Sequence, residues 1–390
     1  MAKQSASAAG RGESGRGSGG ASRRGTKLAG KKAAAKKRTQ PPAALEQPLQ
    51  TGPVTLAEAE LRASAAARAR GAESVALAAA PAEKLAPKDV ATVRTRLKKQ
   101  EDRELAQRIR EYKATMAILE RRGVAGARVA PTEFAGRESV VALEAANRPL
   151  RVVAEGDSWF NYPPFPFHGG LVKRLRTLLG VPILDLSQAG DEVRNMLGVK
   201  QRTLIATHLE DGSPAGGEWD CFLFSGGGND IVGNPMALWI RPYVAGASAA
   251  SLIHQPRFDA ALGIIRAGYE DLIDLRNRLS PNTELVFHSY DFAIPDGRGV
   301  CGVGPWMWPA FEARGYPTTA AAFPVIKEML RQFATMLAHL ASTNQGITFV
   351  DTQNTLSPVP SSWHNELHPS DAGYDLVAQK ILQRLRVRFP

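Results

Sequence analysis

The sequence has only two cysteines in 390 residues, Cys221 and Cys301. This count excludes a disulfide-rich scaffold, and the two positions do not form a zinc-binding pattern. No apolar run is long enough for a transmembrane helix. The first residues also lack the apolar segment of a secretory signal, because 5–20 is rich in serine, glycine and arginine. We therefore expect a cytoplasmic location, with export by a signal-independent route left open.

Acidic residues are nearly absent from the first 40 positions, which hold eleven Lys and Arg residues and one acid, Glu13. The whole chain carries +11, so almost all of the net charge lies in this segment. Because 1–50 also lacks large apolar side chains, we expect it to be a disordered basic tail. Its charge suits contact with nucleic acid or an anionic surface through 1–40, but a solubilising or secretion-related tail is the more common explanation of such a run.

Residues 51–148 predict a helical extension. Thr55 and Glu58 have the spacing of a capping box, in which each side chain accepts a hydrogen bond from a free backbone N–H. A long amphipathic helix is predicted over about 89–122. Its apolar residues recur at alternating spacings of four and three along one stripe: Leu105, Ile109, Tyr112, Met116 and Leu119. The stripe predicts either packing onto the following domain or self-association.

From residue 149 to the end, apolar runs alternate with amphipathic stretches, which is typical of a parallel sheet with helices on both faces. We expect strands at 150–155, 182–187, 220–225, 283–289 and 347–351. Helices are expected at 170–179, 191–209, 257–279, 323–343 and 371–387. This alternation predicts an α/β protein with a central five-stranded parallel sheet, a flavodoxin-like three-layer α/β/α sandwich.

Four short blocks follow predicted strands or precede the last helix. Ser158 stands just after the first strand, and serines at that edge of a parallel sheet face the crevice where ligands bind. The blocks are Gly156-Asp157-Ser158, Ser187-Gln188-Ala189-Gly190-Asp191, Ser225-Gly226-Gly227-Gly228-Asn229-Asp230 and His364-Asn365-Glu366-Leu367-His368-Pro369. In this order they resemble the SGNH/GDSL hydrolase superfamily of esterases and lipases. The resemblance covers 149–390 and implies one catalytic domain with the SGNH hydrolase fold.

The resemblance assigns roles to four residues. Ser158 corresponds to the nucleophile and His368 to the base that removes its proton. The oxyanion hole corresponds to the backbone N–H groups of Ser158 and Gly190 and the side-chain amide of Asn229. The residue types suit these roles, because glycine allows close approach of its backbone and an asparagine amide offers two donors.

One position departs from the family pattern. The family has an aspartate three residues before the histidine, whereas this chain has Asn365. An asparagine carbonyl can orient a neutral imidazole but cannot stabilise its cation as a carboxylate does. We favour Asn365 as the orienting residue and keep Glu366, Asp351 and Asp291 as alternative acids.

Aromatic residues gather after the nucleophile and in a long loop at 292–324. Together with the loop at 231–256, these segments are long enough to be lids or binding loops. We expect substrate-lining roles for Trp159, Phe160, Trp306 and Trp308, which favours an acyl chain or an aromatic ester.

The sequence therefore predicts a serine esterase or lipase that needs no cofactor and no metal. Two alternatives share the fold and the chemistry: a carbohydrate O-deacetylase and a phospholipase. A third is a non-catalytic binding protein in which Asn365 marks a lost site and the tail binds nucleic acid or the cell envelope. The acyl and alcohol parts of the substrate, the oligomeric state and the biological process are not set by the sequence.

Overall fold

The computed structural model describes residues 55, 56, 59, 60, 87–123, 148–163, 169–300 and 304–389. The predicted tail at 1–50, with its proposed anionic partners, lies outside the described residues. So do Cys301, Glu58 and the greater part of the segment between Thr55 and the long helix.

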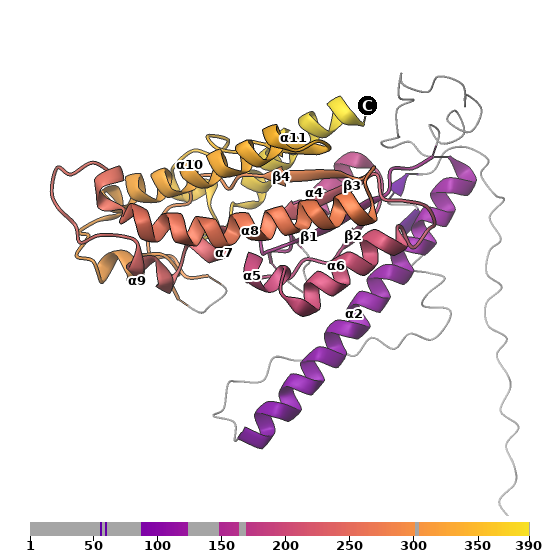
Figure 1. The fold of residues 1–390 in the computed structure, drawn as a ribbon, viewed down its shortest axis with the longest axis horizontal. Helices are drawn as coiled ribbons and strands as arrows, with labels where there is room; N and C mark the ends of the chain where they lie inside the picture. Colours follow the sequence, from indigo (N-terminus) through magenta and orange to yellow (C-terminus); the bar gives the residue numbers. More distant parts are fainter. Residues whose placement is uncertain are drawn as a thin grey trace, which may run out of the picture. The chain divides into compact units, whose positions relative to one another are not determined.

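A five-stranded parallel sheet forms the centre of the fold (Figure 1). Its order is β2 (Ile183–Asp185), β1 (Val152–Gly156), β3 (Cys221–Ser225), β4 (Glu284–His288) and β5 (Ile347–Val350). Val152 pairs with Ile183 on one side and with Cys221 on the other. Each strand lies within two residues of its predicted bounds, and the carboxyl ends of all five meet at one edge of the sheet.

Helices cover both faces of this sheet (Figure 1). One layer contains α4 (Gly170–Leu179) and α11 (Asp371–Arg388), which contact each other; the other contains α5 (Val193–Met196), α6 (Val199–Asp211), α8 (Gln255–Leu279) and α10 (Thr319–Thr343). Right-handed crossovers produce this division, because the chain moves from β1 to β2 in one direction and through β3, β4 and β5 in the other. The predicted three-layer sandwich is confirmed.

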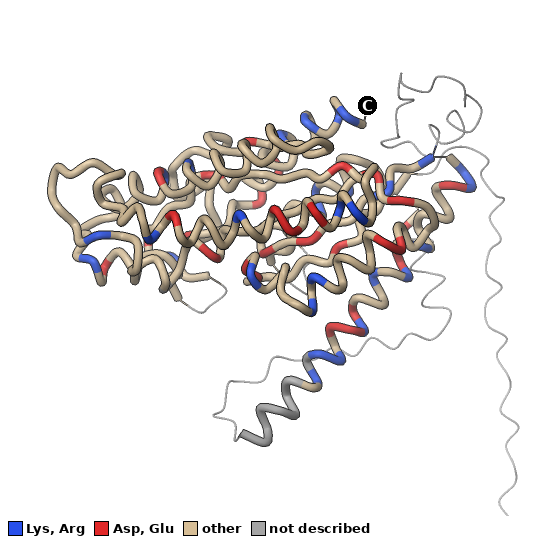
Figure 2. Tube along the Cα trace, viewed as in Figure 1, with Lys and Arg blue, Asp and Glu red and all other residues tan. Residues whose placement is uncertain are grey.

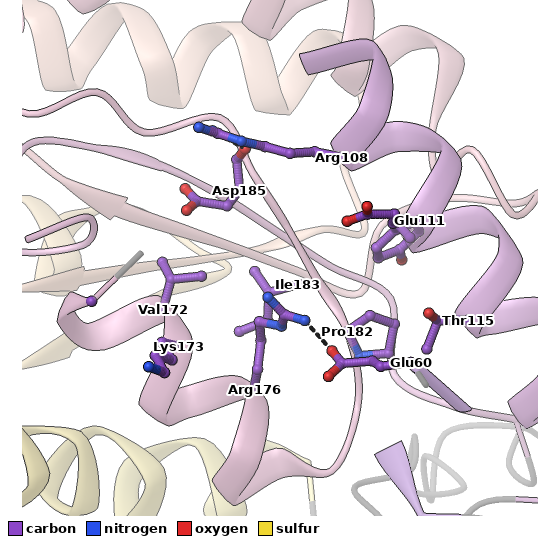
Figure 3. A pocket seen from close by; sticks show the side chains of 12 residues that line it. Glu60, Arg108, Glu111, Thr115, Val172, Lys173, Arg176, Pro182, Ile183 and Asp185 are labelled. Carbon is purple, nitrogen blue, oxygen red and sulfur yellow. Dashed lines mark hydrogen bonds and ion pairs between the residues drawn. The ribbon is translucent and has the colours of Figure 1, made fainter. Parts of the chain in front are cut away.

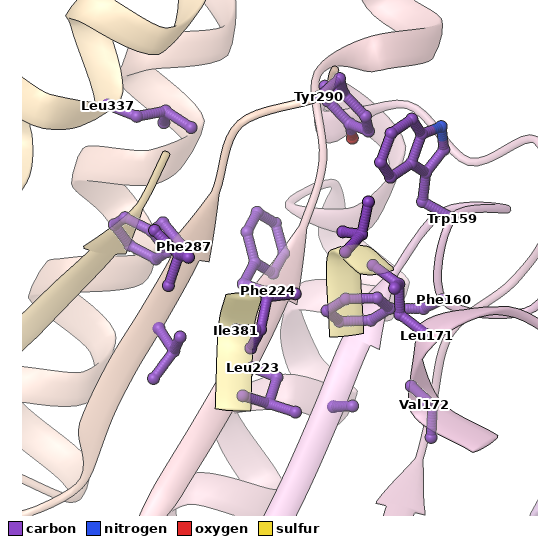
Figure 4. Close-up of a cluster of buried hydrophobic side chains, with 14 of the residues drawn as sticks. Trp159, Phe160, Leu171, Val172, Leu223, Phe224, Phe287, Tyr290, Leu337 and Ile381 are labelled. Carbon is purple, nitrogen blue, oxygen red and sulfur yellow. The ribbon is translucent and has the colours of Figure 1, made fainter. Parts of the chain in front are cut away.

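Buried side chains from strands and helices fill the space between the layers (Figure 4). Phe224 of β3 meets Tyr269 of α8 edge to face, with ring centroids 5.0 Å apart. Members of the same core that Figure 4 labels include Phe160, Leu171, Leu223, Phe287, Leu337 and Ile381. This core holds the strand ends, and hence the site loops, in fixed positions.

Two predicted helices differ from those in the structure. The helix expected at 191–209 is interrupted at Leu197 and Gly198, which separate α5 from α6. Helix α10 begins before the predicted residue 323, because the Thr318 hydroxyl accepts a hydrogen bond from the Ala321 N–H and caps the helix there. Pro324 consequently lies inside the helix rather than at its start.

Helix α2 (Pro87–Arg122) packs against the edge strand β2. Its stripe residues Tyr112, Met116 and Leu119 are buried. The Tyr112 ring lies 5.7 Å from that of Trp219, and Arg108 donates a hydrogen bond to the Asp185 carbonyl. Figure 2 shows charges of both signs along the helix. The stripe thus packs onto the α/β domain, where α2 covers the edge of the sheet.

The two long loops contain short helices and contact each other. Loop 231–256 holds η1 (Asn234–Leu238) and η2 (Ala250–Leu252), and loop 292–324 holds α9 (Trp308–Glu312). The Tyr243 N–H donates to the Arg314 carbonyl, and the Arg314 guanidinium donates to the Ala237 carbonyl. None of the helices that the structure describes is long and apolar enough to span a membrane.

Candidate active site

Ser158 lies in the tight turn that follows β1. The Asp157 carboxylate accepts a hydrogen bond from the Trp159 N–H at 3.0 Å, which fixes the turn. Glycine is required at 156, because a Cβ there would lie 2.7 Å from the Ser225 carbonyl oxygen. The close approach of β1 to the end of β3 therefore sets the position of Ser158.

Asp157 is buried beneath the nucleophile and is engaged with structural partners. Besides the turn N–H, it accepts hydrogen bonds from the hydroxyls of Ser225 at 3.0 Å and Tyr290 at 2.5 Å. Burial raises the pKa of Asp157 to about 7, although these three donors oppose the shift. These contacts make Asp157 a residue that builds the turn.

His368 reaches Ser158 from the loop that precedes α11. Its Nε2 lies 2.7 Å from Ser158 Oγ, although 210 residues separate the two in sequence. The loop closes on itself through a hydrogen bond from the His364 N–H to the His368 carbonyl, and Ser370 then caps α11 by accepting from the Gly373 N–H. The structure thus brings Ser158 and His368 together at the carboxyl edge of the sheet.

Asn365 holds the other side of the imidazole. Its Oδ1 accepts hydrogen bonds from the backbone N–H groups of Leu367 and His368, both at 2.9 Å, and lies 3.0 Å from His368 Nδ1. Because two backbone donors point at this atom, it is the carbonyl oxygen, and His368 Nδ1 must carry a proton to donate to it. In the neutral ring Nε2 is then an acceptor, as the removal of a proton from Ser158 requires.

The environment of His368 disfavours its charged form. The side chain is buried, and this burial, together with the nearby His364, lowers the pKa of His368 to about 3. The imidazole is therefore neutral over the ordinary pH range and available to accept a proton.

The three expected oxyanion donors follow the carboxyl ends of three neighbouring strands, β1, β2 and β3. Asn229 belongs to the short helix α7 (Gly228–Ile231), and its amide donates to the Asp191 carbonyl at 2.9 Å. This hydrogen bond connects it to the loop that carries Gly190, which is exposed with a φ of 88°. Among the described residues, no hydrogen-bond partner is found for the backbone N–H of Ser158 or of Gly190.

Glu366, the nearest alternative acid, is bound elsewhere. Its fully buried carboxylate accepts four backbone N–H groups of loop 292–324, at 2.5–3.0 Å: Gly297, Trp306, Met307 and Trp308. Asp291 and Asp351 likewise accept hydrogen bonds from groups other than His368. No carboxylate of the described residues meets the His368 ring, whose Nδ1 partner is Asn365.

A small pocket of mainly apolar lining opens beside Ser158. Asn229 lies in its wall, as do side chains that the sequence does not single out: Val232, Tyr290, Ala293, Leu330 and Leu367. Trp159 also lines it, but the Trp159 ring is mostly buried, with its N–H bonded to the Leu367 carbonyl. These lining residues come from distant segments, and a single sequence contains no signal that groups them.

The other predicted lining residues lie outside this pocket. Phe160 is buried in the core, where its ring stacks on that of His288 with centroids 5.5 Å apart. Trp306 is 36% exposed and packs over Gly233, and Trp308 is half-buried near Gly297. Both belong to the segment whose backbone N–H groups donate to Glu366, and their substrate-lining role stays a prediction.

A second pocket lies between α2, α4 and β2 (Figure 3). Its walls carry both signs of charge, with Arg176 paired to Glu60 and Arg108 close to Asp185. Neither Ser158 nor His368 lines it. Within the described part of the chain, no group of three or more His, Cys, Asp or Glu side chains is arranged to hold a metal ion.

Residues 154–376 match the GDSL-like lipase/acylhydrolase family. The match spans more than half of the chain, and the chain belongs to this family of GDSL/SGNH hydrolases. No curated protein matches the sequence.

Several solved structures are similar to the chain. An extracellular lipase from Streptomyces rimosus is 19% identical, with 60% of this chain and 98% of the lipase covered and a TM-score of 0.38. A family 3 carbohydrate esterase from Clostridium thermocellum is 16% identical, with coverages of 61% and 96% and a TM-score of 0.35. The catalytic domain of a peptidoglycan O-acetyltransferase from Streptococcus pneumoniae is 13% identical, with coverages of 62% and 96% and a TM-score of 0.35.

Proposed function

We propose that the protein is a serine hydrolase that cleaves carboxylic esters through an acyl-enzyme on Ser158. The observation that carries this proposal is the chain of contacts from Ser158 Oγ to His368 Nε2 at 2.7 Å and from His368 Nδ1 to Asn365 Oδ1 at 3.0 Å. A serine hydroxyl is a weak nucleophile unless a base is held within hydrogen-bond reach and is itself oriented by a third group. The three residues meet both conditions.

In the first step Ser158 Oγ attacks the ester carbonyl carbon while its proton passes to His368 Nε2. The electrons of the carbonyl bond move onto oxygen. When this tetrahedral intermediate collapses, the bond to the alcohol breaks, and His368 returns the proton to the departing oxygen. Water then repeats the sequence on the acyl-enzyme, with His368 as base, and releases the carboxylic acid and free Ser158.

The negative oxygen of each intermediate would be held by the N–H groups of Ser158 and Gly190 and by the Asn229 amide. Within the described part of the chain the two backbone donors have no partner, which supports this role, because a donor already bound would have to be released first. Removing the Asn229 donor, as in Asn229→Ala, should lower kcat on the order of 100-fold by analogy with other oxyanion donors.

The pocket beside Ser158 supports a short acyl group. Its walls are mainly apolar, and Val232, Ala293 and Leu330 lie within one small space that would not admit a long chain without movement. Among the reactions that this mechanism serves, removal of acetyl groups from a carbohydrate thus fits better than cleavage of a long-chain phospholipid.

Covalent labelling with a fluorophosphonate probe tests the proposal. Wild-type protein should be labelled, whereas Ser158→Ala and His368→Ala should not. Ser361→Ala and His339→Ala change an exposed serine and an exposed histidine and serve as matched controls. If folded wild-type protein stays unlabelled, Ser158 is not activated, and the non-catalytic binding protein becomes the better explanation.

A further inference from the structure

The mechanism places a positive charge on His368 where no carboxylate of the described residues balances it. Asn365 offers a neutral carbonyl, and the ring is buried, so a proton on this imidazole is poorly solvated. In triads with aspartate the carboxylate supplies the missing stabilisation. Some other group near the ring must offset part of this penalty if the base is to act efficiently.

Tyr162 lies where it can stabilise the charged imidazole of His368. Its ring lies parallel to that of His368, with an angle of 1° between the planes and 3.7 Å between the centroids. Its hydroxyl oxygen also accepts a hydrogen bond from Asn365 Nδ2 at 3.0 Å. A single buried side chain thus contacts both the base and the residue that orients it.

The stacking geometry suits a protonated His368 better than the neutral ring. Two neutral aromatic rings prefer edge-to-face or offset arrangements with centroids about 4.5–7 Å apart, because the negative faces of their π systems repel. The Tyr162–His368 pair is closer and flatter than this. A protonated imidazole reverses the interaction, since the negative face of tyrosine attracts a cation. The contact therefore becomes favourable when the proton arrives.

We propose that Tyr162 is a positioning residue that takes over the electrostatic role of the absent aspartate. Its face stabilises the imidazolium of His368 in the transition state, and its hydroxyl keeps the Asn365 carbonyl directed at Nδ1. This inference depends on the proposed serine hydrolase function. Because the stabilisation arises only when His368 is charged, it should raise kcat rather than lower KM.

Progressive fluorination of the ring at 162 separates electrostatics from packing. Tyr162→Phe removes only the hydroxyl, and phenylalanines with increasing numbers of fluorines keep the shape while weakening the negative face. We expect kcat to fall steadily along the series, by on the order of tenfold from Phe to pentafluoro-Phe, with KM unchanged. The same series at Phe389, at the far end of α11 from the site, should leave kcat constant.

Asn365→Asp supplies the second arm. A carboxylate at 365 can stabilise the imidazolium directly, so fluorination at 162 should lower kcat far less in this background. If kcat is insensitive to fluorination while the wild type reacts normally, Tyr162 only packs, and the inference is wrong although the hydrolase proposal stands. If the wild type itself is neither labelled by the fluorophosphonate nor active, the proposed function fails first.

Discussion

Leu330 lies in the wall of the pocket beside Ser158, and its size should set the length of the acyl group. In Leu330→Ala the space vacated can accept further methylenes, each worth about 0.8 kcal/mol when buried. We expect kcat/KM for a p-nitrophenyl hexanoate, relative to the acetate, to rise on the order of tenfold. Leu376→Ala, an exposed site on α11, is the control. An unchanged ratio would show that the acyl chain binds elsewhere.

Local blocks explain why some of the candidate site can be read from the sequence. Ser158, Asn365 and His368 each stand in a short motif next to a strand or helix end. Tyr162 has no such mark, because its contact with Asn365 depends on a loop that folds back across 203 residues. Phe160 is predicted to line the substrate site but lies in the core. The sequence pattern of an apolar residue after a strand does not distinguish a residue that faces a pocket from one that faces the core.

At the scale of elements, Glu366 joins two loops. It extends from the loop of His368 and Asn365, and its carboxylate accepts four backbone N–H groups of loop 292–324. The Glu366 carboxylate thus fixes the shape of that loop, whereas His368 is held by Asn365.

Glu366→Gln should therefore destabilise the protein without changing its chemistry. In the wild type both carboxylate oxygens accept backbone N–H groups, whereas in the variant an amide nitrogen, which cannot accept, replaces one oxygen. Each buried donor left without a partner costs about 1–3 kcal/mol. We expect a loss of unfolding free energy on the order of 3 kcal/mol in denaturant titrations, with Glu312→Gln, exposed on α9, as the control. Normal stability combined with lost labelling would instead indicate that Glu366 acts on His368 as the acid.

The strands could be predicted more accurately than the helices. The strands are short apolar runs with sharp ends, of which β1, β3 and β4 are fully buried, so the apolar pattern alone defines them. The break between α5 and α6 could not be predicted, because Leu197 and Gly198 interrupt an otherwise continuous amphipathic pattern. The start of α10 depends on the side-chain cap at Thr318. In the sequence Pro324 instead indicates a later start, because proline is typical of the first turn of a helix.

At the scale of the whole molecule, buried titratable groups link stability to pH. Burial raises the pKa of Asp157 to about 7 and those of Asp191 and Asp230 to about 6, from 3.8. Burial also lowers the pKa of His288 to about 4 and of His368 to about 3, from 6.5. At a pH between its ordinary and its raised pKa, each of these carboxyl groups is protonated in the folded state and ionised in the unfolded chain. At a pH between its lowered and its ordinary pKa, each histidine is neutral in the folded state and protonated in the unfolded chain.

The carboxyl groups should prevail, because burial also raises the pKa of Glu155 well above its ordinary value. The folded state then binds more protons than the unfolded state, and stability falls as pH rises. We expect a higher Tm at about pH 5 than at about pH 8 in scanning calorimetry. Glu155→Gln should flatten this dependence, and Glu270→Gln, exposed on α8, should not. A Tm that rises with pH in the wild type would contradict the expectation.

The packing of α2 on the edge of the sheet has a consequence for synthesis on the ribosome. The helix emerges before the strands of the described sheet, and Ser213, which contacts Tyr112, follows 101 residues later. Until β2 and the loop around Trp219 have been translated, the apolar stripe of α2 has no surface to cover. During that interval the apolar stripe of α2 is exposed to solvent and can bind chaperones or other nascent chains. The order of translation therefore favours chaperone binding to α2 until the hydrolase domain is complete.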